Sequence, residues 1–149
     1  MISDSTLMIY ADTSFFVSVY IGDRHWPIAD KLLHSDPRVW FTPLHFAEWT
    51  HAVWQHVFRG QMSAEKANAV RHVLETDQHA GFWIAAAVPE SAFQLCAELG
   101  RRHGPKLGVR TLDSLHVACA LELRAERFWT FDERQAKLAK AEGLKTAGI

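Results

Sequence analysis

Residues 7–14 read Leu-Met-Ile-Tyr-Ala-Asp-Thr-Ser, an apolar run that ends abruptly in polar residues. The run from Leu7 to Ala11 has the length and composition of a buried strand, and Asp12 with the two hydroxyl residues after it can end that strand and cap a helix. Apolar residues over Phe15–Tyr20 then continue as a helical turn, which Gly22 breaks. This stretch predicts a β-strand that leads directly into an α-helix, with Asp12 at the carboxyl end of the strand.

The alternation of strand and helix continues to the end of the chain, with Gly, Pro, Ser and Asp residues between the elements. We expect further strands at Val39–Thr42, Phe82–Val88 and Arg127–Phe131, and an edge strand after Gly143. In the first half of the chain we expect helices at Pro27–His34, from Pro43 to near Gly60, and from Ser63 until the pattern fades over Asp77–Gly81. In the second half we expect helices from Pro89 through Leu99, from Thr111 through Leu123, and over about Glu133–Glu142. Residues 101–110 (RRHGPKLGVR) are expected to form a loop.

Apolar spacing within these helices predicts the side chains that face the core. The expected inward residues are Phe46, Trp49, Val53 and Trp54; then Ala67, Val70, Val73 and Leu74; then Phe93, Cys96, Ala97 and Leu99; and finally Leu112, Leu115, Cys119 and Leu123. The helix that begins at Pro43 also carries Phe58, which makes too many aromatic residues for one inward stripe. Part of its surface is therefore expected to bind a partner helix or a second copy of the protein.

Alternating strands and helices predict an α/β fold in which helices flank a parallel sheet. With 149 residues, 48% of them hydrophobic, the chain is long enough for one domain over residues 1–149 and too short for two. No apolar run approaches the roughly 18 residues of a membrane span, and the N-terminus lacks signal-peptide features, so we expect a cytoplasmic protein without a membrane segment. Cys96 and Cys119 have no metal-site spacing and are expected to be small buried residues without a disulfide.

The formal net charge is −1, from 16 Lys and Arg against 17 Asp and Glu residues, so the chain is not a general polycation. Binding to nucleic acid needs only a local basic rim. Candidates are the segment 103–110 and residues Arg101, Arg102, Arg134, Lys137 and Lys140. Each cluster alone fits an ordinary solvated helix face equally well.

Four acidic residues, Asp12, Glu48, Asp113 and Asp132, are flanked by residues that should be buried. Carboxylates on a hydrophobic framework are costly to desolvate unless a positive charge offsets them, and a divalent cation is the simplest way to neutralise acids from four distant segments. In parallel α/β sheets, ligands bind beyond the carboxyl ends of the strands, where Asp12 and Asp132 are placed. The residues predict an acidic pocket for a divalent cation.

Each acid also has an ordinary structural explanation. Asp12 and Asp132 can cap the helices that follow them, Asp113 can be a first-turn acid near the positive end of a helix, and Glu48 can be a surface carboxylate. His116 lies one helical turn after Asp113, which invites a catalytic role, but a histidine in an apolar helix is more often a hydrogen-bonded structural group.

The segments IYADTS (9–14), FAEW (46–49), RTLDSLHVACAL (110–121) and FWTFDERQAKLAKAEGL (128–144) resemble, in this order and spacing, the PIN domain, and specifically the ribonuclease toxins of bacterial VapBC toxin–antitoxin modules. The resemblance covers almost the whole chain and implies a three-layer fold with a central, mainly parallel sheet. It implies that Asp12, Glu48, Asp113 and Asp132 are the catalytic acids and the ligands of Mg2+ or Mn2+.

The resemblance also implies a function. The chain would be a metal-dependent endoribonuclease toxin that leaves 5′-phosphate and 3′-hydroxyl ends, is inhibited by an antitoxin protein and forms a homodimer. Thr130 matches a hydroxyl position that supports the site, and Ser14 matches a polar position that can contact phosphate. Arg110 lies just before the Asp113 helix, where its guanidinium can bind phosphate bidentately; the alternative is a solvated loop arginine. The alternative is a PIN-like module that binds RNA or protein without cutting it. A phosphohydrolase of the haloacid dehalogenase type is disfavoured, because it would need an acid at Ser14.

Overall fold

A five-stranded parallel sheet forms the centre of the molecule. The computed structural model describes residues 7–149. The strands are β1 (Met8–Ala11), β2 (Arg38–Phe41), β3 (Ile84–Ala85), β4 (Arg127–Trp129) and β5 (Lys145–Ala147), in the order β3-β2-β1-β4-β5. Every neighbouring pair of strands is parallel. The predicted α/β class and parallel sheet are confirmed.

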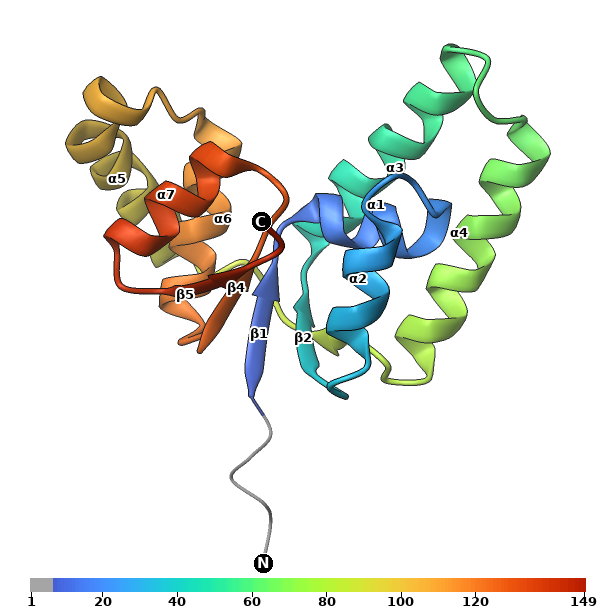
Figure 1. The fold of residues 1–149 in the computed structure, drawn as a ribbon, viewed down its shortest axis with the longest axis horizontal. Helices are drawn as coiled ribbons and strands as arrows, with labels where there is room; N and C mark the ends of the chain where they lie inside the picture. Colours follow the sequence, from blue (N-terminus) through green and yellow to red (C-terminus); the bar gives the residue numbers. More distant parts are fainter. Residues whose placement is uncertain (1–6) are drawn as a thin grey trace, which may run out of the picture.

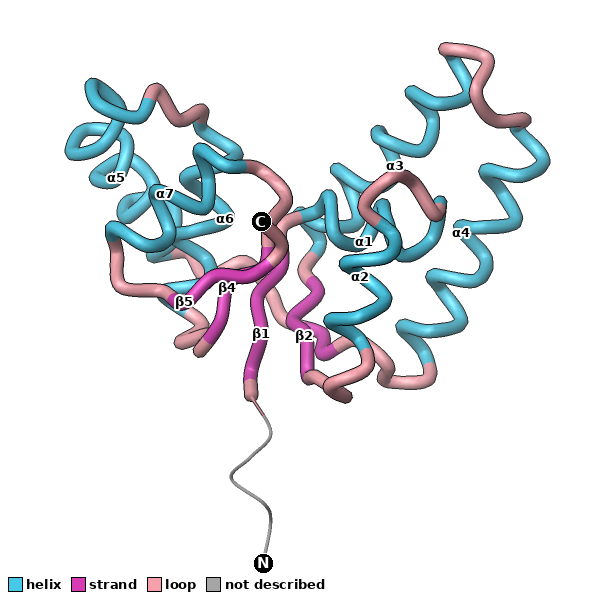
Figure 2. The backbone as a smooth tube through the Cα atoms, viewed as in Figure 1, coloured by secondary structure: helices cyan, strands magenta, loops and turns pink. Residues whose placement is uncertain are grey.

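Helices cover both faces of this sheet. They are α1 (Thr13–Ile21), α2 (Trp26–Leu33), α3 (Pro43–Phe58), α4 (Ala64–His79), α5 (Ser91–Leu107), α6 (Thr111–Glu122) and α7 (Glu133–Ala141). In Figure 1, helices α1–α4 lie on one side of the sheet and α5–α7 lie on the other, and Figure 2 shows the strands between the two groups. No helix within residues 7–149 combines the length and apolar character needed to cross a bilayer.

Strand β1 is the point at which the sheet changes its direction of winding. From β1 the chain adds β2 and β3 on one side, and then it returns to add β4 and β5 on the other. In open parallel sheets, ligand sites form beyond the carboxyl ends of the strands at such a switch point. Asp12 directly follows β1, and its backbone N–H donates to the carbonyl of Trp129 at 3.0 Å. The fold therefore places Asp12 at the position where a ligand site is expected.

The side chains of β1 alternate between two hydrophobic cores, one on each face of the sheet. Ile9 and Ala11 belong to the core under α1–α4, where aromatic rings dominate: Phe16 contacts Trp83 edge-on, with ring centroids 4.9 Å apart. Tyr10 belongs to the core under α5–α7 and stacks on Phe128 with centroids 5.8 Å apart. Asp12 therefore follows a strand that is buried on both faces.

Helix α3 begins with a reciprocal cap that also contacts the end of β1. The hydroxyl of Thr42 accepts from the N–H of His45, and the ring nitrogen Nδ1 of His45 accepts the N–H of Thr42 at 3.0 Å. Histidine here takes the role that Glu or Gln has in the usual capping box. The other ring nitrogen of His45 lies 2.7 Å from the carbonyl oxygen of Ala11. The contact holds the first turn of α3 against the residue before Asp12, and Glu48 follows one turn later.

Helix α5 is longer than predicted, and the expectation of a loop over residues 101–110 is wrong. The helix runs to Leu107 with Pro105 inside it. Pro105 cannot donate the usual hydrogen bond to the residue four positions earlier, but the helix continues for two residues beyond it. The helix ends at Gly108, whose φ of 61° is left-handed and whose N–H donates to the carbonyl of Gly104 at 2.8 Å. Only residues 108–110 separate α5 from α6.

Strand β3 is shorter than the predicted Phe82–Val88. Only Ile84 and Ala85 pair, with Trp40 and Phe41 of β2. Pairing stops because β2 itself ends at Phe41, where the next residue caps α3. The expected ends of two other strands, at Thr42 and Phe131, also move back, to Phe41 and Trp129.

Several predicted core positions are exposed instead, namely Trp54, Val73, Phe93, Ala97 and Leu112. In α5 the buried residues are Ala92, Cys96 and Leu99, which recur at intervals of four and three. Phe93, which is 58% exposed, therefore lies outside the true stripe, which begins one residue earlier than predicted. Cys96 and Cys119 are buried free thiols, as predicted.

Candidate functional site

Asp12 is a buried carboxylate, only 7% exposed, at the switch point of the sheet. It occupies the N-cap position of α1, but its side chain makes no capping hydrogen bond. Its two oxygens instead accept hydroxyl hydrogen bonds, one from Ser14 and one from Thr130, the latter at 2.8 Å. Burial raises the pKa of Asp12, and the hydrogen bonds from Ser14 and Thr130 offset only part of that rise. The ordinary explanation of Asp12 as a helix cap does not fit this geometry.

Glu48 projects from α3 and is held by two donors from other helices. The hydroxyl of Thr13 donates to its Oε1 at 2.7 Å, and Nε2 of His116 contacts the same oxygen. The Glu48 side chain remains 25% exposed. Burial acts to raise the pKa of Glu48, but the contacts with His116 and Thr13 outweigh it, so that the pKa lies below the usual value. Glu48 is therefore ionised at neutral pH.

Asp113 lies in the first turn of α6 beside an arginine. Its carboxylate is 25% exposed and lies 3.9 Å from Nε of Arg110, a side chain that is itself 85% exposed. Its backbone carbonyl accepts a hydrogen bond from the amide of Gln135 on α7 at 3.3 Å. Asp113 is thus anchored through its backbone, and its partly exposed carboxylate makes a weak ionic contact with Arg110.

Asp132 is an exposed N-cap of α7. Its Oδ1 accepts the backbone N–H of Gln135 at 2.8 Å, and its own N–H donates to the hydroxyl of Thr130 at 3.0 Å. The structural role that the sequence allowed for Asp132 is therefore present. Thr130 contacts both Asp12 and Asp132 and joins the two strand ends into one hydrogen-bonded unit.

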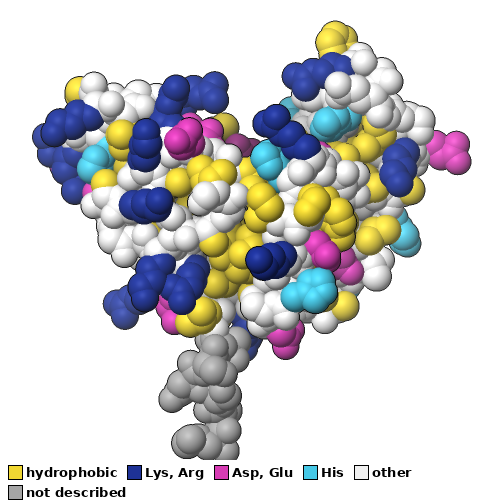
Figure 3. Space-filling model, in the orientation of Figure 1, with side chains coloured by type: hydrophobic (Ala, Val, Ile, Leu, Met, Phe, Trp, Pro, Cys, Tyr) yellow, Lys and Arg dark blue, Asp and Glu magenta, His cyan; other side chains and the backbone are white. Residues whose placement is uncertain are grey.

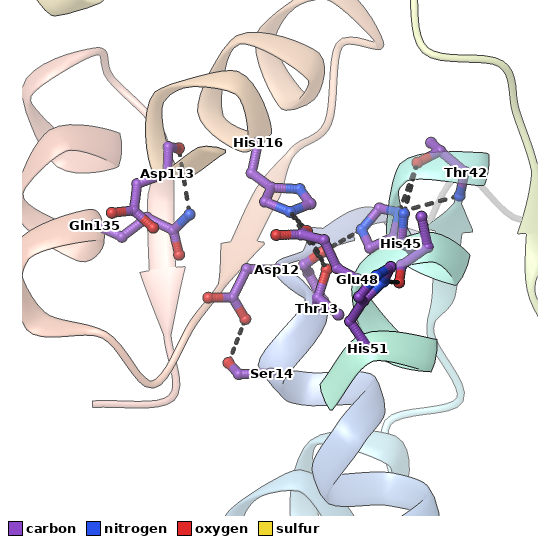
Figure 4. A network of polar contacts seen from close by, with 12 residues as sticks. Asp12, Thr13, Ser14, Thr42, His45, Glu48, His51, Asp113, His116 and Gln135 are labelled. Atoms are coloured by element: carbon purple, nitrogen blue, oxygen red, sulfur yellow. Dashed lines mark hydrogen bonds and ion pairs between the residues drawn. The ribbon is translucent and has the colours of Figure 1, made fainter. Parts of the chain in front are cut away.

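Figure 4 shows Asp12 lying between Asp113 on one side and the Glu48–His116 pair on the other. The acids border one region at the carboxyl end of β1. In residues 7–149, however, no group of three or more His, Cys, Asp or Glu side chains is close enough to hold one metal ion. The donor chemistry still fits Mg2+, because this cation prefers oxygen ligands, keeps several waters and needs only one or two protein carboxylates in addition to a substrate phosphate. Asp12 with one neighbouring acid meets that requirement.

Three residues of the site were not predicted, namely Tyr10, Thr13 and His45. The hydroxyl of Tyr10 lies 2.7 Å from Nδ1 of His116, and the rings of His45 and His116 have centroids 5.0 Å apart. Burial, and then His116, hold the pKa of His45 well below its usual value, so that its ring is neutral. A signal for Tyr10 was available, because a tyrosine in a fully buried strand needs a hydrogen-bond partner for its hydroxyl.

A groove with basic walls lies beside Asp132. It is lined by Lys106, Leu107, Arg110, Asp132, Glu133, Arg134 and Lys137, which come from the end of α5, the loop after it and the start of α7. Arg134 donates to the carbonyl of Gly108 at 3.3 Å and so holds the two sides together. In Figure 3, Lys and Arg side chains gather over the half of the molecule that contains α5 and α7. Part of the predicted basic rim thus forms one surface next to the acids.

Arg101 and Arg102, two other members of the predicted rim, do not line this groove. They pair with acids on their own side of the molecule: Arg101 with Glu98, and Arg102 with Glu98 and Glu142. For these two residues the ordinary interpretation, a solvated helix face with ion pairs, describes the structure.

The fold is shared with several solved toxins and toxin–antitoxin complexes. VapC20 of Mycobacterium tuberculosis, a toxin described as cleaving the sarcin–ricin loop, is 18% identical with a TM-score of 0.67 over 95% of this chain and 98% of that one. VapBC2 of Rickettsia felis, solved with a promoter DNA fragment, is 13% identical with a TM-score of 0.65 over 95% and 98%. FitAcB of Neisseria gonorrhoeae is 18% identical with a TM-score of 0.63 over 93% and 96%.

No curated protein sequence gives a significant match to the chain. The sequence does match the family model for the PIN domain, over residues 9–141. That match extends from β1 to the end of α7 and includes all four acids of the site. The chain therefore belongs to the PIN domain family.

Proposed function

We propose that this protein is a metal-dependent endoribonuclease that hydrolyses RNA phosphodiester bonds, with Asp12, Glu48, Asp113 and Asp132 as the catalytic acids around Mg2+ or Mn2+. The observation that carries the proposal is the state of Asp12. Its carboxylate is buried at the switch point of the sheet, does not cap α1 and has its pKa raised by burial. A buried carboxylate is costly unless a positive charge offsets it, and a divalent cation supplies that charge.

The acids and hydroxyls of the site have different proposed roles, which depend on where each side chain lies. Asp12 and Asp113 would hold the cation, with Glu48 and Asp132 on either side of them. Ser14 and Thr130 fix both oxygens of Asp12 through their hydroxyls, so that the carboxylate does not rotate. A cation bound there supplies two effects: it lowers the pKa of a bound water, and it stabilises the leaving 3′ oxygen.

RNA is the proposed substrate because a basic groove continues from the acids. Lys106, Arg110, Arg134 and Lys137 line that groove together with Asp132 and Glu133. Phosphates on either side of the scissile bond need cationic partners, since contacts to the backbone supply most of the sequence-independent affinity for nucleic acid. The similar fold of VapC20, a toxin that cleaves the sarcin–ricin loop, supports RNA as the substrate class.

The proposed biological setting is a type II toxin–antitoxin module. VapBC2 of Rickettsia felis and a toxin–antitoxin complex of Klebsiella pneumoniae share the fold. We propose that this chain binds a cognate antitoxin protein and forms a homodimer. Exposed aromatic side chains on α3 support a protein partner there: Phe58 is 86% exposed and Trp54 is 38% exposed.

The test is incubation of the purified protein, free of antitoxin, with total RNA and Mg2+ or Mn2+. Asp12→Asn and Asp113→Asn variants, tested in parallel, report whether cleavage depends on these two acids. We expect cleavage by the wild type, loss of cleavage on chelation of the metal, and loss of at least about 100-fold in rate for each variant. Cleavage that survives both substitutions would contradict the assignment of the site.

The second candidate function is a PIN module that binds RNA or protein without cutting. One observation favours it: one oxygen of Asp132 caps α7 and one oxygen of Glu48 is held by His116 and Thr13, so each carboxylate has only its second oxygen left for a metal ion. The formation of new 5′-phosphate ends on RNA distinguishes the two candidate functions. A folded wild type that binds RNA but produces no new 5′-phosphate ends with either metal supports the binding module.

A further inference from the structure

We propose that Tyr10 and His116 are positioning residues for Glu48: the Tyr10 hydroxyl orients the His116 ring, and the ring in turn holds the Glu48 carboxylate toward the site. The inference rests on the proposed function for the role of Glu48 as a metal-binding acid. It concerns residues from β1, α6 and α3, which are far apart in the sequence and meet only in the folded protein.

The contact between His116 and Glu48 defines which ring nitrogen carries the proton. Nε2 of His116 contacts Oε1 of Glu48 and lies 3.3 Å from the hydroxyl of Thr13. An ionised carboxylate can only accept hydrogen bonds. Nε2 must therefore carry the proton and donate it to Glu48.

The contact between His116 and Tyr10 completes the arrangement. When Nε2 of a neutral imidazole carries the proton, Nδ1 is an acceptor. The Tyr10 hydroxyl lies 2.7 Å from Nδ1 and is the donor that this nitrogen needs. Tyr10 is fully buried and stacked on Phe128, so its hydroxyl is fixed in place by the core. The rigid core under α5–α7 thus sets the orientation of a side chain on α3.

Both donors act on the same oxygen of Glu48. Thr13 donates to Oε1 from α1, at 2.7 Å, and His116 donates to Oε1 from α6. Within the described residues, Oε2 accepts no protein hydrogen bond, and the side chain is 25% exposed. The arrangement leaves one oxygen of Glu48 directed at the site while the other is held from two sides.

His116 does not itself face the substrate. It is 3% exposed, and both of its ring nitrogens are occupied by protein atoms. Its effect must therefore pass through Glu48, which separates a positioning residue from a catalytic one. Removal of hydrogen-bond partners behind metal-ligating groups commonly costs about 10- to 100-fold in metal affinity or activity.

The experiment combines three measurements on His116→Leu, His116→Gln and Tyr10→Phe. Long-range 1H–15N spectra of histidine-labelled protein report which ring nitrogen of His116 is protonated. Calorimetric titration with Mn2+, without RNA, reports metal affinity. Cleavage rates are compared in the wild type and in a Glu48→Gln background. Tyr20→Phe is the matched control, because the Tyr20 hydroxyl also makes side-chain hydrogen bonds, to Asp77 and Trp83, which are partly buried and lie away from Glu48.

The expected spectra show protonation at Nε2 in the wild type and a changed Nδ1 signal in Tyr10→Phe. We expect His116→Leu to weaken Mn2+ binding by about 10-fold or more, and His116→Gln, which keeps an N–H donor, to recover part of the loss. In the Glu48→Gln background, His116→Leu should cause no further loss of rate, since the two residues act as one unit. Tyr20→Phe should lower thermal stability and leave Mn2+ affinity unchanged.

Two results would overturn the inference. One is a proton on Nδ1 rather than Nε2 in the wild type. The other is a His116→Leu variant that binds Mn2+ as tightly as the wild type, or whose cleavage rate falls by the same factor in the wild-type and Glu48→Gln backgrounds. Failure of the proposed function is a separate result, namely a wild type that cuts no RNA. In that case the spectra and the Mn2+ titration still decide whether Tyr10 and His116 position Glu48.

Discussion

The hydroxyl of Thr130 donates a hydrogen bond of 2.8 Å to the carboxylate of Asp12, across 118 positions of the chain. Both side chains are buried, and the same hydroxyl oxygen accepts the N–H of Asp132. Thr130 therefore connects the end of β1 to the start of α7.

Replacement of Thr130 by valine should destabilise the protein by about 1–3 kcal/mol, because a buried carboxylate and a backbone N–H each lose a partner. Equilibrium unfolding in urea measures the change. Thr130→Ser should keep most of the stability, since it retains the hydroxyl. Thr50→Val is the control, because the Thr50 hydroxyl bonds only to the carbonyl of Phe46 within α3. An equal loss in Thr50→Val and Thr130→Val would contradict the special role of Thr130.

Asp12→Asn should make the metal-free protein more stable at neutral pH. The pKa of Asp12 is raised by burial in the folded state, so between the unfolded and the folded pKa the folded protein binds more protons. The free energy of unfolding then falls as pH rises through that window, and asparagine has no such dependence. Thermal unfolding in EDTA should show a higher midpoint for Asp12→Asn at about pH 8 and a smaller difference at about pH 4.

Addition of Mg2+ should raise the unfolding midpoint of the wild type and leave that of Asp12→Asn unchanged, since a ligand of the native state stabilises only the protein that binds it. If the metal-free wild type is more stable than Asp12→Asn from about pH 4 to about pH 8, then burial of the ionised Asp12 carboxylate does not destabilise the folded protein.

Loss of charge in the basic groove should weaken RNA binding in a salt-dependent way. Lys106 and Lys137 line the groove. In an Asp12→Asn background, which prevents cleavage, Lys106→Gln and Lys137→Gln should each reduce the slope of log Kd against log salt concentration by about 1. Lys66→Gln, an exposed residue on α4, should leave the slope unchanged. Equal effects from all three substitutions would contradict a defined RNA path.

Gly148→Ala should disturb the site from the C-terminal end of the chain. A Cβ atom at Gly148 would lie 2.1 Å from the carbonyl oxygen of Thr130, and the backbone there has a φ of +118°. The expected cost is about 1–3 kcal/mol, with a loss of cleavage rate because Thr130 moves relative to Asp12. Gly100→Ala is the control: it lies in helix α5 with open space around it and should stabilise the protein by about 0.5–1 kcal/mol.

Much of the architecture could be predicted because local signals and tertiary structure agree. The apolar run that ends at Ala11 is a strand buried on both faces, and the abrupt change to polar residues places Asp12 at its carboxyl end. Glycine and proline residues predict the ends of helices less reliably. Residues 101–110, which contain Gly104, Pro105 and Gly108, are expected from the sequence to form a loop, but α5 continues through Pro105 and ends only at Gly108.

The interior of the site could not be predicted in the same way. The contact of Tyr10 with His116 spans 106 positions, so the sequence indicates that the Tyr10 hydroxyl needs a partner but does not identify that partner. The sequence left the roles of Asp12 and Asp132 equally open as helix caps. Only the folded geometry distinguishes them, because Asp132 accepts the N–H of Gln135 whereas the carboxylate of Asp12 makes no capping bond.

The two cores that meet at β1 have a consequence for how such chains diverge. Adjacent residues of β1, Tyr10 and Ala11, belong to different cores, and β4 likewise contributes Phe128 to one core and Trp129 to the other. The sheet therefore separates the two cores, and we expect substitutions in the core under α1–α4 to have little effect on packing under α5–α7, provided that these strands keep their alternation. Such changes can be accommodated within either core while Asp12 stays in place at the end of β1.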